Sequence, residues 1–536
     1  EGSDRYDDDL QAAERAAHRD APHGLAALSV WVEPGESDRN IAWTRDLAAA
    51  NEGTEASPYA ARGLVRPRAA EPRGSCWGES TWRRAGAAPS AVRETVAMTD
   101  VAGDARQGRL LRPGTRLSTP RVPATVSAFF ANPVNVLGVV LILALIARAL
   151  WLWLPHGQLI FDESYYVNAA RVILGWDVPA NAPYADAPAG LDPNAEHPPL
   201  GKVLMAASMA VFGDNGIGWR LPTLIAGMVA LLALYGIVRA AGETPRLGIL
   251  AVSLFALDNL ALVHARVGTL DMMALTPLLI GTWLALRGQW VLAGVACAIG
   301  SLVKLTGAFG LLALLILQAI SLFAAWRRTR RIGYADLRPM ILLGSSYAVV
   351  AIAGLWLLDW RFSGYGDPWA HLSHMMSFGA ALQAPGGPTG IASNPWQWLV
   401  NEVDINYLRV AVDTRVNGEI VSSVPSIDVR GAMNPVLIGT APLAFLFAAS
   451  YAWRKGNVLA LWAIVWAAAS YLPYYPLVIL NSRITYLYYF LPVIPALAVA
   501  VALLLRRARL PNSVTWGYLG LMVWGFLAYF PFRRLP

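Results

Sequence analysis

The sequence has little charge for its length. Asp, Glu, Lys and Arg make up 15% of its 536 residues, against about 25% in soluble domains. Hydrophobic residues make up 56%. So few charges exclude an ordinary soluble protein, and the composition indicates a polytopic membrane protein. Lysine is especially scarce, since the only lysines are Lys202, Lys304 and Lys455.

Cysteine is also scarce. Cys76 lies in a polar N-terminal region and Cys297 inside an apolar segment, so the sequence offers neither a disulfide framework nor a cysteine metal site. The formal net charge is +7, but no basic patch interleaved with aromatic residues accompanies it, which argues against nucleic acid as a partner. Most arginines stand at the ends of apolar runs, so the charge indicates membrane topology.

Residues 1–130 lack apolar periodicity and are rich in Ala, Arg, Gly, Pro, Asp and Glu. Such a segment cannot bury enough surface to offset its chain entropy, so we expect it to be disordered and cytoplasmic. Met98 has a basic flank that suits the start of a membrane protein. We therefore interpret the residues before Met98 as an over-extended gene start or a dispensable tail. No signal-peptide cleavage pattern is evident.

Windows of about 20 apolar residues predict about eleven transmembrane helices within residues 131–533. The windows lie near residues 133–154, 218–240, 246–263, 269–286, 290–303, 307–326, 339–358, 434–453, 458–473, 484–505 and 514–530. Two long connections, residues 155–217 and 359–433, are too short to hold a further domain of typical size. Residues 200–212 should lie along the interface or against the bundle, and the tryptophans of NPWQWL (394–399) suit the headgroup zone.

Basic residues set the orientation of this bundle. With the N-terminus inside, every cytoplasmic connection carries Arg or Lys, as the positive-inside rule requires. The residues concerned are Arg239, Arg246, Arg287, Arg327, Arg328, Arg330, Arg331, Arg454, Lys455, Arg506, Arg507 and Arg509. The same alternation brings a second set of polar residues to the extracytoplasmic face. That set is Asp162, Glu163, His197, Arg266, Asp271, Lys304 and Arg483.

A carboxylate beside several cations at an outer interface suits transfer of a sugar from a lipid phosphate. Breaking the sugar–phosphate bond leaves negative charge on the phosphate, and cations stabilise this leaving group. Asp162, beside the anomeric carbon, could accept the proton of an incoming hydroxyl. A single displacement of this kind inverts the anomeric centre.

Each of these residues also has a structural interpretation. Lys304 could extend from a helix end towards the interface, and Arg266 could simply pair with Asp271. His197, which precedes two prolines, could cap a helix start, and Arg483 could anchor the edge of a span. Two other functions stay open as well. One keeps the donor class but transfers the sugar to a lipid or cell-wall glycan, and the other is a transporter or flippase.

Several short motifs occur in one order along the chain. They are FDESYY (161–166), EHPPLGK (196–202), HARVGTLDMM (264–273), GSLVKLTG (300–307), NPWQWL (394–399), MNPVLIG (433–439) and RITYLYYFLPVIP (483–495). In this order they resemble the signatures of the protein O-mannosyltransferases, multi-spanning glycosyltransferases of the GT-C architecture. The resemblance runs from about residue 133 to 530, with HPPLGK as its most specific part.

The resemblance implies an all-α bundle and transfer of mannose from polyprenyl-phosphate-mannose to Ser or Thr of exported proteins, on the outer face of the plasma membrane. It implies that Asp162 is the catalytic base and that Glu163 positions acceptor or donor. Four residues would border the donor phosphate and sugar, and four would shape the site. The first four are Arg266, Asp271, Lys304 and Arg483, and the others are His197, Lys202, Tyr165 and Tyr166.

The chain departs from the family pattern in three respects. Tyr165 and Tyr166 stand where the family often has a His after its Asp-Glu, and Tyr488 and Tyr489 stand where its last motif often has one. The large lumenal β-trefoil domain of eukaryotic members is absent, so the chain resembles the shorter bacterial form. The altered neighbours of Asp162 bear on the acceptor more than on the donor. Carboxylates at Asp162 and Asp271 could hold Mg²⁺ or Mn²⁺ together with a phosphate, although the sequence requires no metal.

Overall fold

The structure, a computed structural model, describes residues 124–416 and 419–532, which belong to one compact unit. The expectations for Met98, Cys76 and the rest of residues 1–123 lie outside the described residues. Helix α3 (Ala124–Ala131) occupies the end of the segment for which we expect disorder, so the ordered part begins before residue 131.

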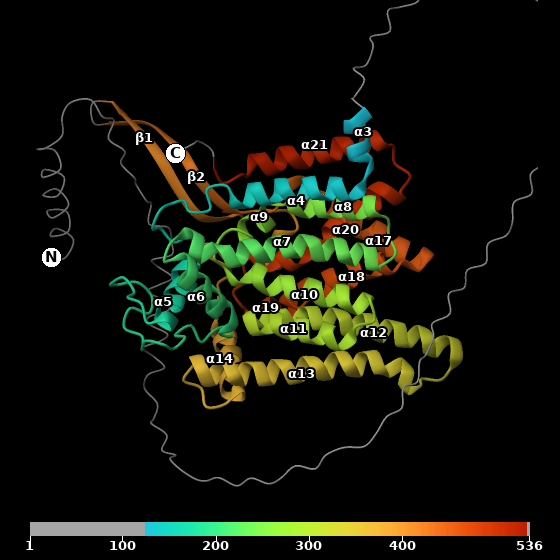
Figure 1. Ribbon diagram of the computed structural model, residues 1–536, viewed down its shortest axis with the longest axis horizontal. Coiled ribbons are helices and arrows are strands. Elements are labelled where there is room, and N and C mark those ends of the chain that lie inside the picture. Colours follow the sequence, from blue (N-terminus) through green and yellow to red (C-terminus); the bar gives the residue numbers. More distant parts are fainter. Residues whose placement is uncertain (1–123, 417–418, 533–536) are drawn as a thin grey trace, which may run out of the picture. The chain divides into compact units, whose positions relative to one another are not determined.

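Helices form most of the described chain, as Figure 1 shows. After α3, the N-terminal half contains α4 (Pro133–Ala149), α5 (Glu163–Leu174), α6 (Leu200–Phe212), α7 (Gly216–Ala240), α8 (Pro245–Ala256), α9 (Asn259–His264), α10 (Leu270–Leu286), α11 (Trp290–Val303), the 3₁₀ turn η1 (Leu305–Gly307) and α12 (Ala308–Thr329). The C-terminal half contains α13 (Tyr334–Phe362), α14 (Pro368–Ala381), α15 (Pro395–Trp398), α16 (Pro435–Gly439), α17 (Ala441–Lys455), α18 (Val458–Tyr471), α19 (Tyr474–Asn481), η2 (Leu487–Val493), α20 (Ile494–Arg507) and α21 (Asn512–Ala528).

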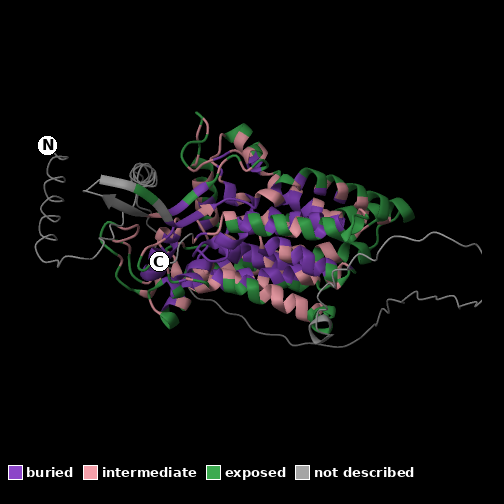
Figure 2. Ribbon diagram, turned by 90° about the horizontal axis from the view of Figure 1, so that it is seen from above, coloured by how far each residue is buried: buried purple, intermediate pink, exposed green. Residues whose placement is uncertain are grey.

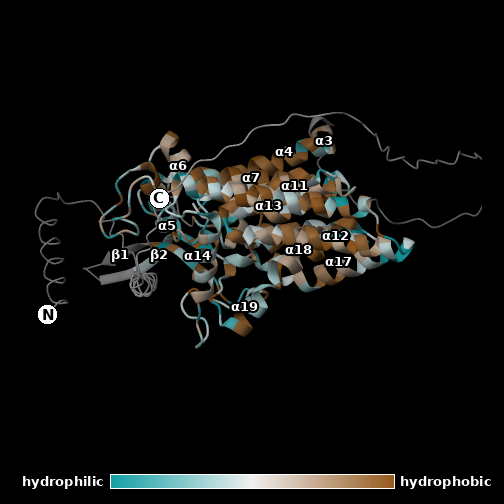
Figure 3. Cartoon of the chain, turned by 90° about the horizontal axis from the view of Figure 1, so that it is seen from below, coloured by the Kyte–Doolittle hydropathy of each residue, from teal (hydrophilic) through white to brown (hydrophobic). Residues whose placement is uncertain are grey.

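Every apolar window of the sequence coincides with a helix or with two consecutive helices. Among the described residues, 5 helical segments are both long enough and apolar enough to cross a membrane, and five shorter apolar helices accompany them. The polytopic all-helical bundle is thus confirmed, whereas the exact number of crossings stays a prediction. Figure 3 shows apolar residues along the outer surfaces of the long helices, where a membrane protein meets lipid.

The core lies between the long helices, where Figure 2 shows the buried residues concentrated. Small residues let the helices approach closely. Along α20 the alanines 496, 498, 500 and 502 are buried. A Cβ added to Gly294 of α11 would come within 2.4 Å of the carbonyl oxygen of Leu343 on α13. This close packing fixes the helix ends from which the polar residues project.

The two ends of the bundle differ. α5, α6, α14 and a β-hairpin gather at one end, and the arginine-bearing connection between α12 and α13 lies at the other (Figure 1). α6 has the bounds expected for the short amphipathic piece, and it packs against α5 and α7. The sequence-based division of polar residues between the two faces therefore agrees with the fold.

The second long connection differs from the all-α expectation. It contains antiparallel strands β1 (Ile405–Val416) and β2 (Glu419–Gly431), with Ile405 opposite Gly431. The NPWQWL motif also divides its tryptophans, since Trp396 is exposed while Trp398 is buried and donates from Nε1 to Ser393 Oγ at 2.9 Å. Only Trp396 is therefore free to meet a headgroup zone.

Candidate active site

Asp162 precedes the first turn of α5, yet its side chain makes no capping hydrogen bond. The carboxylate is therefore not used by its own helix, although Asp at this position usually is. Burial raises the pKa of Asp162 to about 7, while the positive charge of Lys304 opposes this shift and the negative charge of Asp271 adds to it. A carboxyl group with such a pKa can exchange a proton near neutral pH.

Glu163 has a different environment from its neighbour. Its buried carboxylate accepts hydrogen bonds from Arg220 Nε at 2.7 Å and Arg220 Nη2 at 2.8 Å. The backbone N–H groups of Ile160 and Gly268 also donate to it, each at 2.7 Å. Both oxygens are therefore occupied, and Glu163 ties the start of α5 to α7 and to the turn before α10. This geometry gives Glu163 a positioning role and leaves it no oxygen for a substrate.

Lys304 lies where α11 ends and η1 begins, with an extended backbone between the two. Its ammonium donates to Asp271 Oδ1 at 2.7 Å and lies 5.2 Å from the ring centre of Tyr488 and 5.8 Å from that of Tyr489. Asp271, in the first turn of α10, keeps Oδ2 buried without a hydrogen bond, 3.7 Å from His264 Nδ1. Tyr488 and Tyr489, which stand where the last motif of the family often has a histidine, therefore lie on one side of the Lys304–Asp271 ion pair.

Arg483 is a cation without a counter-ion among the described ion pairs. Its backbone pairs with Gln383, and its Nη1 is buried without a hydrogen-bond partner. It lies close enough to His197 to help lower the pKa of that imidazole, which burial and Lys304 lower further. A buried guanidinium nitrogen without a partner is costly unless an anion completes it, so Arg483 is the strongest candidate for a phosphate ligand.

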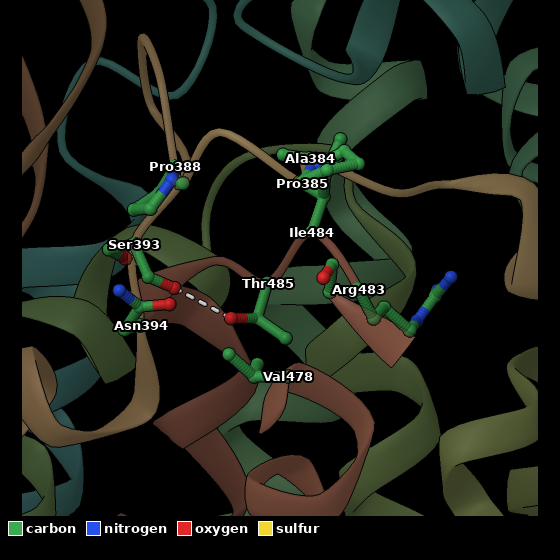
Figure 4. A pocket seen from close by; sticks show the side chains of 11 residues that line it. Ala384, Pro385, Pro388, Ser393, Asn394, Val478, Arg483, Ile484 and Thr485 are labelled. Atoms are coloured by element: carbon green, nitrogen blue, oxygen red, sulfur yellow. Dashed lines mark hydrogen bonds between the residues drawn. The ribbon is translucent and has the colours of Figure 1, made fainter. Parts of the chain in front are cut away.

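Arg483 also borders a cavity of about 190 Å³. Figure 4 shows its guanidinium extending away from Ser393, Asn394 and Thr485, which line the other side. Thr485 Oγ1 donates to the Ser393 carbonyl oxygen at 2.6 Å. Because the charged end of Arg483 leaves this cavity, the cavity and the candidate phosphate ligand face different directions.

The structure does not bring Arg266 to this cluster. Its Nη2 donates to the Leu150 carbonyl oxygen at 2.8 Å and its Nη1 to that of Ala147 at 3.3 Å, and its guanidinium lies 4.7 Å from the ring centre of Phe532. Arg266 therefore completes the C-terminus of α4, where carbonyl groups lack helical partners. These contacts include neither Asp271, its sequence-based partner, nor Lys304 and Arg483, the other residues expected to bind the sugar donor.

Lys202 organises the loop before α6. Its buried ammonium pairs with Asp192 at 2.7 Å and donates to the carbonyl oxygen of His197 at 2.8 Å. Asn194 supplies two further oxygens to the same ammonium. Lys202 thus shapes the segment that holds His197 near Lys304 and Arg483, as the resemblance implies. Tyr166 is buried with its ring centre 6.0 Å from that of His197, and Tyr165 faces Tyr184 across 6.4 Å.

Three residues at this site were not singled out from the sequence. Arg220 lies within a span and pairs with Glu163. His264, at the end of α9, lies 2.8 Å from the hydroxyl of Tyr407 on β1. Arg220 and His264 are ionisable residues in or beside membrane-length apolar segments, where such residues rarely lack a function. Their positions in the sequence are therefore a usable signal. Tyr407 lies 143 residues from His264, and only the fold brings them together.

The carboxylates of Asp162 and Asp271 already have a cation beside them. Among the described residues, no group of three or more His, Cys, Asp or Glu side chains could hold a metal ion. The Lys304 ammonium donates to Asp271 Oδ1, while Asp271 Oδ2 has no hydrogen bond. Lys304 thus supplies positive charge next to Asp271, and the reaction proposed below uses side chains alone.

The fold and this site define a polytopic helical membrane protein with a cluster of ionisable residues at one end of its bundle. The structure is similar to that of the Saccharomyces cerevisiae protein O-mannosyltransferase Pmt1-Pmt2 complex bound to the sugar donor, with a TM-score of 0.57 and 10% sequence identity. The match covers 74% of this chain and 90% of that chain. The fold class expected from the motifs is confirmed.

The sequence comparisons match part of the chain. The model of the dolichyl-phosphate-mannose-protein mannosyltransferases matches residues 196–356, which agrees with the resemblance over that part. The polyprenol-phosphate-mannose–protein mannosyltransferase of Mycobacterium tuberculosis is 36% identical over 139 residues, 25% of each chain. The undecaprenyl phosphate-α-4-amino-4-deoxy-L-arabinose arabinosyl transferase of Pseudomonas paraeruginosa is 29% identical over 221 residues, 38% of each. The matched region thus spans about a quarter to two fifths of these relatives.

Proposed function

We propose that this protein transfers mannose from polyprenyl-phosphate-mannose to Ser or Thr hydroxyls of exported proteins, with inversion, at the extracytoplasmic face of the plasma membrane. The observation that carries the proposal is a carboxyl group without a capping bond, Asp162, close enough to Lys304 to feel its charge, while Lys304 and Arg483 both lie close enough to His197 to lower its pKa. The match to the mannosyltransferase family model across residues 196–356 supports mannose as the sugar.

Asp162 is the general base of this reaction. Its carboxylate accepts the proton of the acceptor hydroxyl while the hydroxyl oxygen forms a bond to the anomeric carbon of mannose. The bond from that carbon to the phosphate oxygen breaks in the same step, and the lipid phosphate leaves with the electron pair. One displacement with no glycosyl-enzyme intermediate inverts the anomeric centre. The pKa of about 7 for Asp162 suits a base that works near neutral pH.

Arg483 and Lys304 stabilise the departing phosphate. Arg483 has a buried Nη1 with no partner, so an incoming phosphate oxygen satisfies a donor that is otherwise unpaired. Lys304 is held by Asp271 and by the faces of Tyr488 and Tyr489, which fix the position of its charge before the substrate arrives. A preorganised cation of this kind lowers the barrier because it need not reorient as negative charge develops.

A second function uses the same donor class but a lipid or cell-wall glycan as acceptor, and two observations bear on it. The match to the arabinosyl transferase of Pseudomonas paraeruginosa extends over 221 residues, against 139 for the mannosyltransferase of Mycobacterium tuberculosis. The tyrosines Tyr165 and Tyr166, beside the base, replace the usual histidine of the protein-modifying family. The acceptor is therefore the part of the proposal that most needs an experiment.

The experiment incubates purified protein in lipid with labelled polyprenyl-phosphate-mannose and a Ser/Thr-rich peptide. Wild type should place label on the peptide, and Asp162→Asn should lower the rate about 10²- to 10⁴-fold while keeping the fold. Asp186→Asn, an exposed aspartate in the same connection, is the matched control and should retain the wild-type rate.

The distribution of label separates the alternatives. Label found only in a glycolipid would show that the acceptor is a lipid or glycan and not a protein. Near-normal transfer by Asp162→Asn would remove the general-base assignment. Movement of the intact lipid-linked sugar between leaflets without any transfer would favour the flippase interpretation.

A further inference from the structure

Tyr407 on β1 connects the hairpin to the residue before the candidate base. Its ring stacks on that of Phe161, with ring centres 4.2 Å apart and planes inclined by 14°. Phe161 has a left-handed backbone conformation, with φ of 54°. That conformation is unfavourable for a residue with a side chain, so it persists only where surrounding contacts enforce it.

Phe161 is held by aromatic contacts on two sides. Besides the stack on Tyr407, its ring meets the edge of Tyr488, with centres 5.9 Å apart. The next residue is Asp162, whose side chain has no capping bond to fix it. The direction in which the Asp162 side chain leaves the backbone therefore depends on how Phe161 is held, and Tyr407 is the closer of the two rings that hold it.

The hydroxyl of Tyr407 reaches the other half of the site. It is hydrogen-bonded to His264 Nε2 at 2.8 Å, and His264 Nδ1 is hydrogen-bonded to Thr269 Oγ1 at 3.0 Å. The same Nδ1 lies 3.7 Å from Asp271 Oδ2, and Asp271 holds Lys304. One side chain thus contacts both the segment of the candidate base and the segment of the candidate leaving-group cation.

A glycine on the opposite strand makes room for this ring. A Cβ at Gly431 would lie 2.6 Å from both Cζ and the hydroxyl oxygen of Tyr407, closer than real Cβ contacts come. Gly431 faces Ile405 in the register of the hairpin. The ring position is therefore fixed by strand β2 as well as by the residues that it touches in the bundle.

We propose that Tyr407 is a positioning residue, through which the β-hairpin holds Phe161 and so sets the carboxyl group of Asp162 against the Lys304–Asp271 pair. The Tyr407 ring, stacked on Phe161, positions the carboxyl group of Asp162, and the Tyr407 hydroxyl positions His264 beside Asp271. This inference rests on the proposed function only for its kinetic readout, because the contacts themselves involve no substrate.

Removing the ring should also admit water to Asp162. Burial is the main cause of its raised pKa, so hydration lowers that pKa towards its ordinary value. The charged and titratable groups that face Asp162 are Lys304, Asp271, Tyr165, Tyr166, Tyr407, Tyr486 and Tyr488. Of these only Tyr407 changes in the variants below, so a shift can be assigned to its ring.

The experiment compares Tyr407→Leu, which removes stack and hydroxyl, with Tyr407→Phe, which removes only the hydroxyl. Gly431→Ala displaces the intact ring. Tyr407→Leu should lower kcat about 10²-fold, the cost of a misplacement near 1 Å, with the donor KM nearly unchanged, and Tyr407→Phe should retain most of the rate. Tyr518, whose hydroxyl is bonded to Thr440 at 2.8 Å, provides matched Phe and Leu controls, which should retain the wild-type kcat.

A second measurement needs no turnover. Carbodiimide labelling of Asp162, followed by mass spectrometry across pH, should show a midpoint near pH 7 in the wild type. The midpoint should be lower in Tyr407→Leu and Gly431→Ala and unchanged in the Tyr518 variants. An unchanged midpoint together with an unchanged kcat in Tyr407→Leu would overturn the proposal. Absence of sugar transfer in the wild type would instead refute the proposed function, with the labelling result still deciding the role of Tyr407.

Discussion

Replacing Glu163 by Gln should destabilise the protein far more than it slows the reaction. Glu163 accepts four hydrogen bonds, all between 2.7 and 2.8 Å, from Arg220 and two backbone N–H groups. In the variant, one oxygen becomes an NH₂ group that faces donors and the charge of Arg220 loses its partner. Breaking a buried pair costs about 3–5 kcal/mol, a large share of a typical unfolding free energy of about 5–15 kcal/mol.

The assay is denaturant-induced unfolding in lipid or mild detergent, combined with the transfer rate per folded molecule. Glu163→Gln should lose about 3–5 kcal/mol of unfolding free energy and change the barrier to transfer by less than about 1.4 kcal/mol, a factor of ten. Asp162→Asn should show the reverse, because Asp162 makes no capping bond whose loss would destabilise α5.

A matched control breaks an exposed pair. Asp404 pairs with Arg430, and their side chains are 47% and 33% exposed, so Asp404→Asn should cost no more than about 1 kcal/mol. The reasoning would be refuted if Glu163→Gln were as stable as the wild type yet as inactive as Asp162→Asn. That result would move Glu163 from a positioning role to a chemical one.

The remaining predictions concern the charges of the site. The transfer rate should fall as pH drops through about 7, by about tenfold per pH unit, because protonation removes the base Asp162; a rate independent of pH between 5 and 8 would contradict this. Arg483→Met should raise the donor KM about 10- to 100-fold, the worth of a charge-assisted hydrogen bond. Arg409 is an exposed cation on β1, and Arg409→Met should leave the donor KM unchanged. Equal effects of the two substitutions would argue against a phosphate contact of Arg483. Lys304→Met should lower kcat more than it raises the donor KM, because leaving-group charge develops in the transition state; steady-state kinetics at varied donor separate the two.

The helices could be predicted from the sequence because their signals are local. Each apolar window coincides with helical segments, and α6 has its expected bounds, Leu200–Phe212. The β-hairpin is not predicted by the apolar windows, because it lies between them. Its available signal is period-two alternation, as in Ile405–Val416, where Ile405 and Tyr407 are buried around an exposed Asn406.

The candidate site was predicted in part. The position of Asp162 after the first span and the role of Lys202 in the following loop both follow from motifs that are contiguous in the chain. The roles of Glu163 and Arg266 do not, since each depends on a distant segment. Glu163 meets Arg220 across 57 residues and Arg266 meets Leu150 across 116. A charge at the correct membrane face has several partners within reach, and sequence spacing does not select among them.

The sequence by itself determined that this is a polytopic membrane protein, and it predicts that the acidic doublet Asp162–Glu163 lies on the same face as Lys304, because apolar length and the distribution of arginine act through the bilayer and need no tertiary contact. Tertiary structure alone decided which carboxylate is free and which cation is unpaired. Packing of α5 against α7 and the turn before α10 engages Glu163 and leaves Asp162 without a capping bond. Lys304 pairs with Asp271, whereas Arg483 has no counter-ion within residues 124–416 and 419–532. Partner choice among buried charges is a short-range matter of helix packing, and only the folded chain sets those distances.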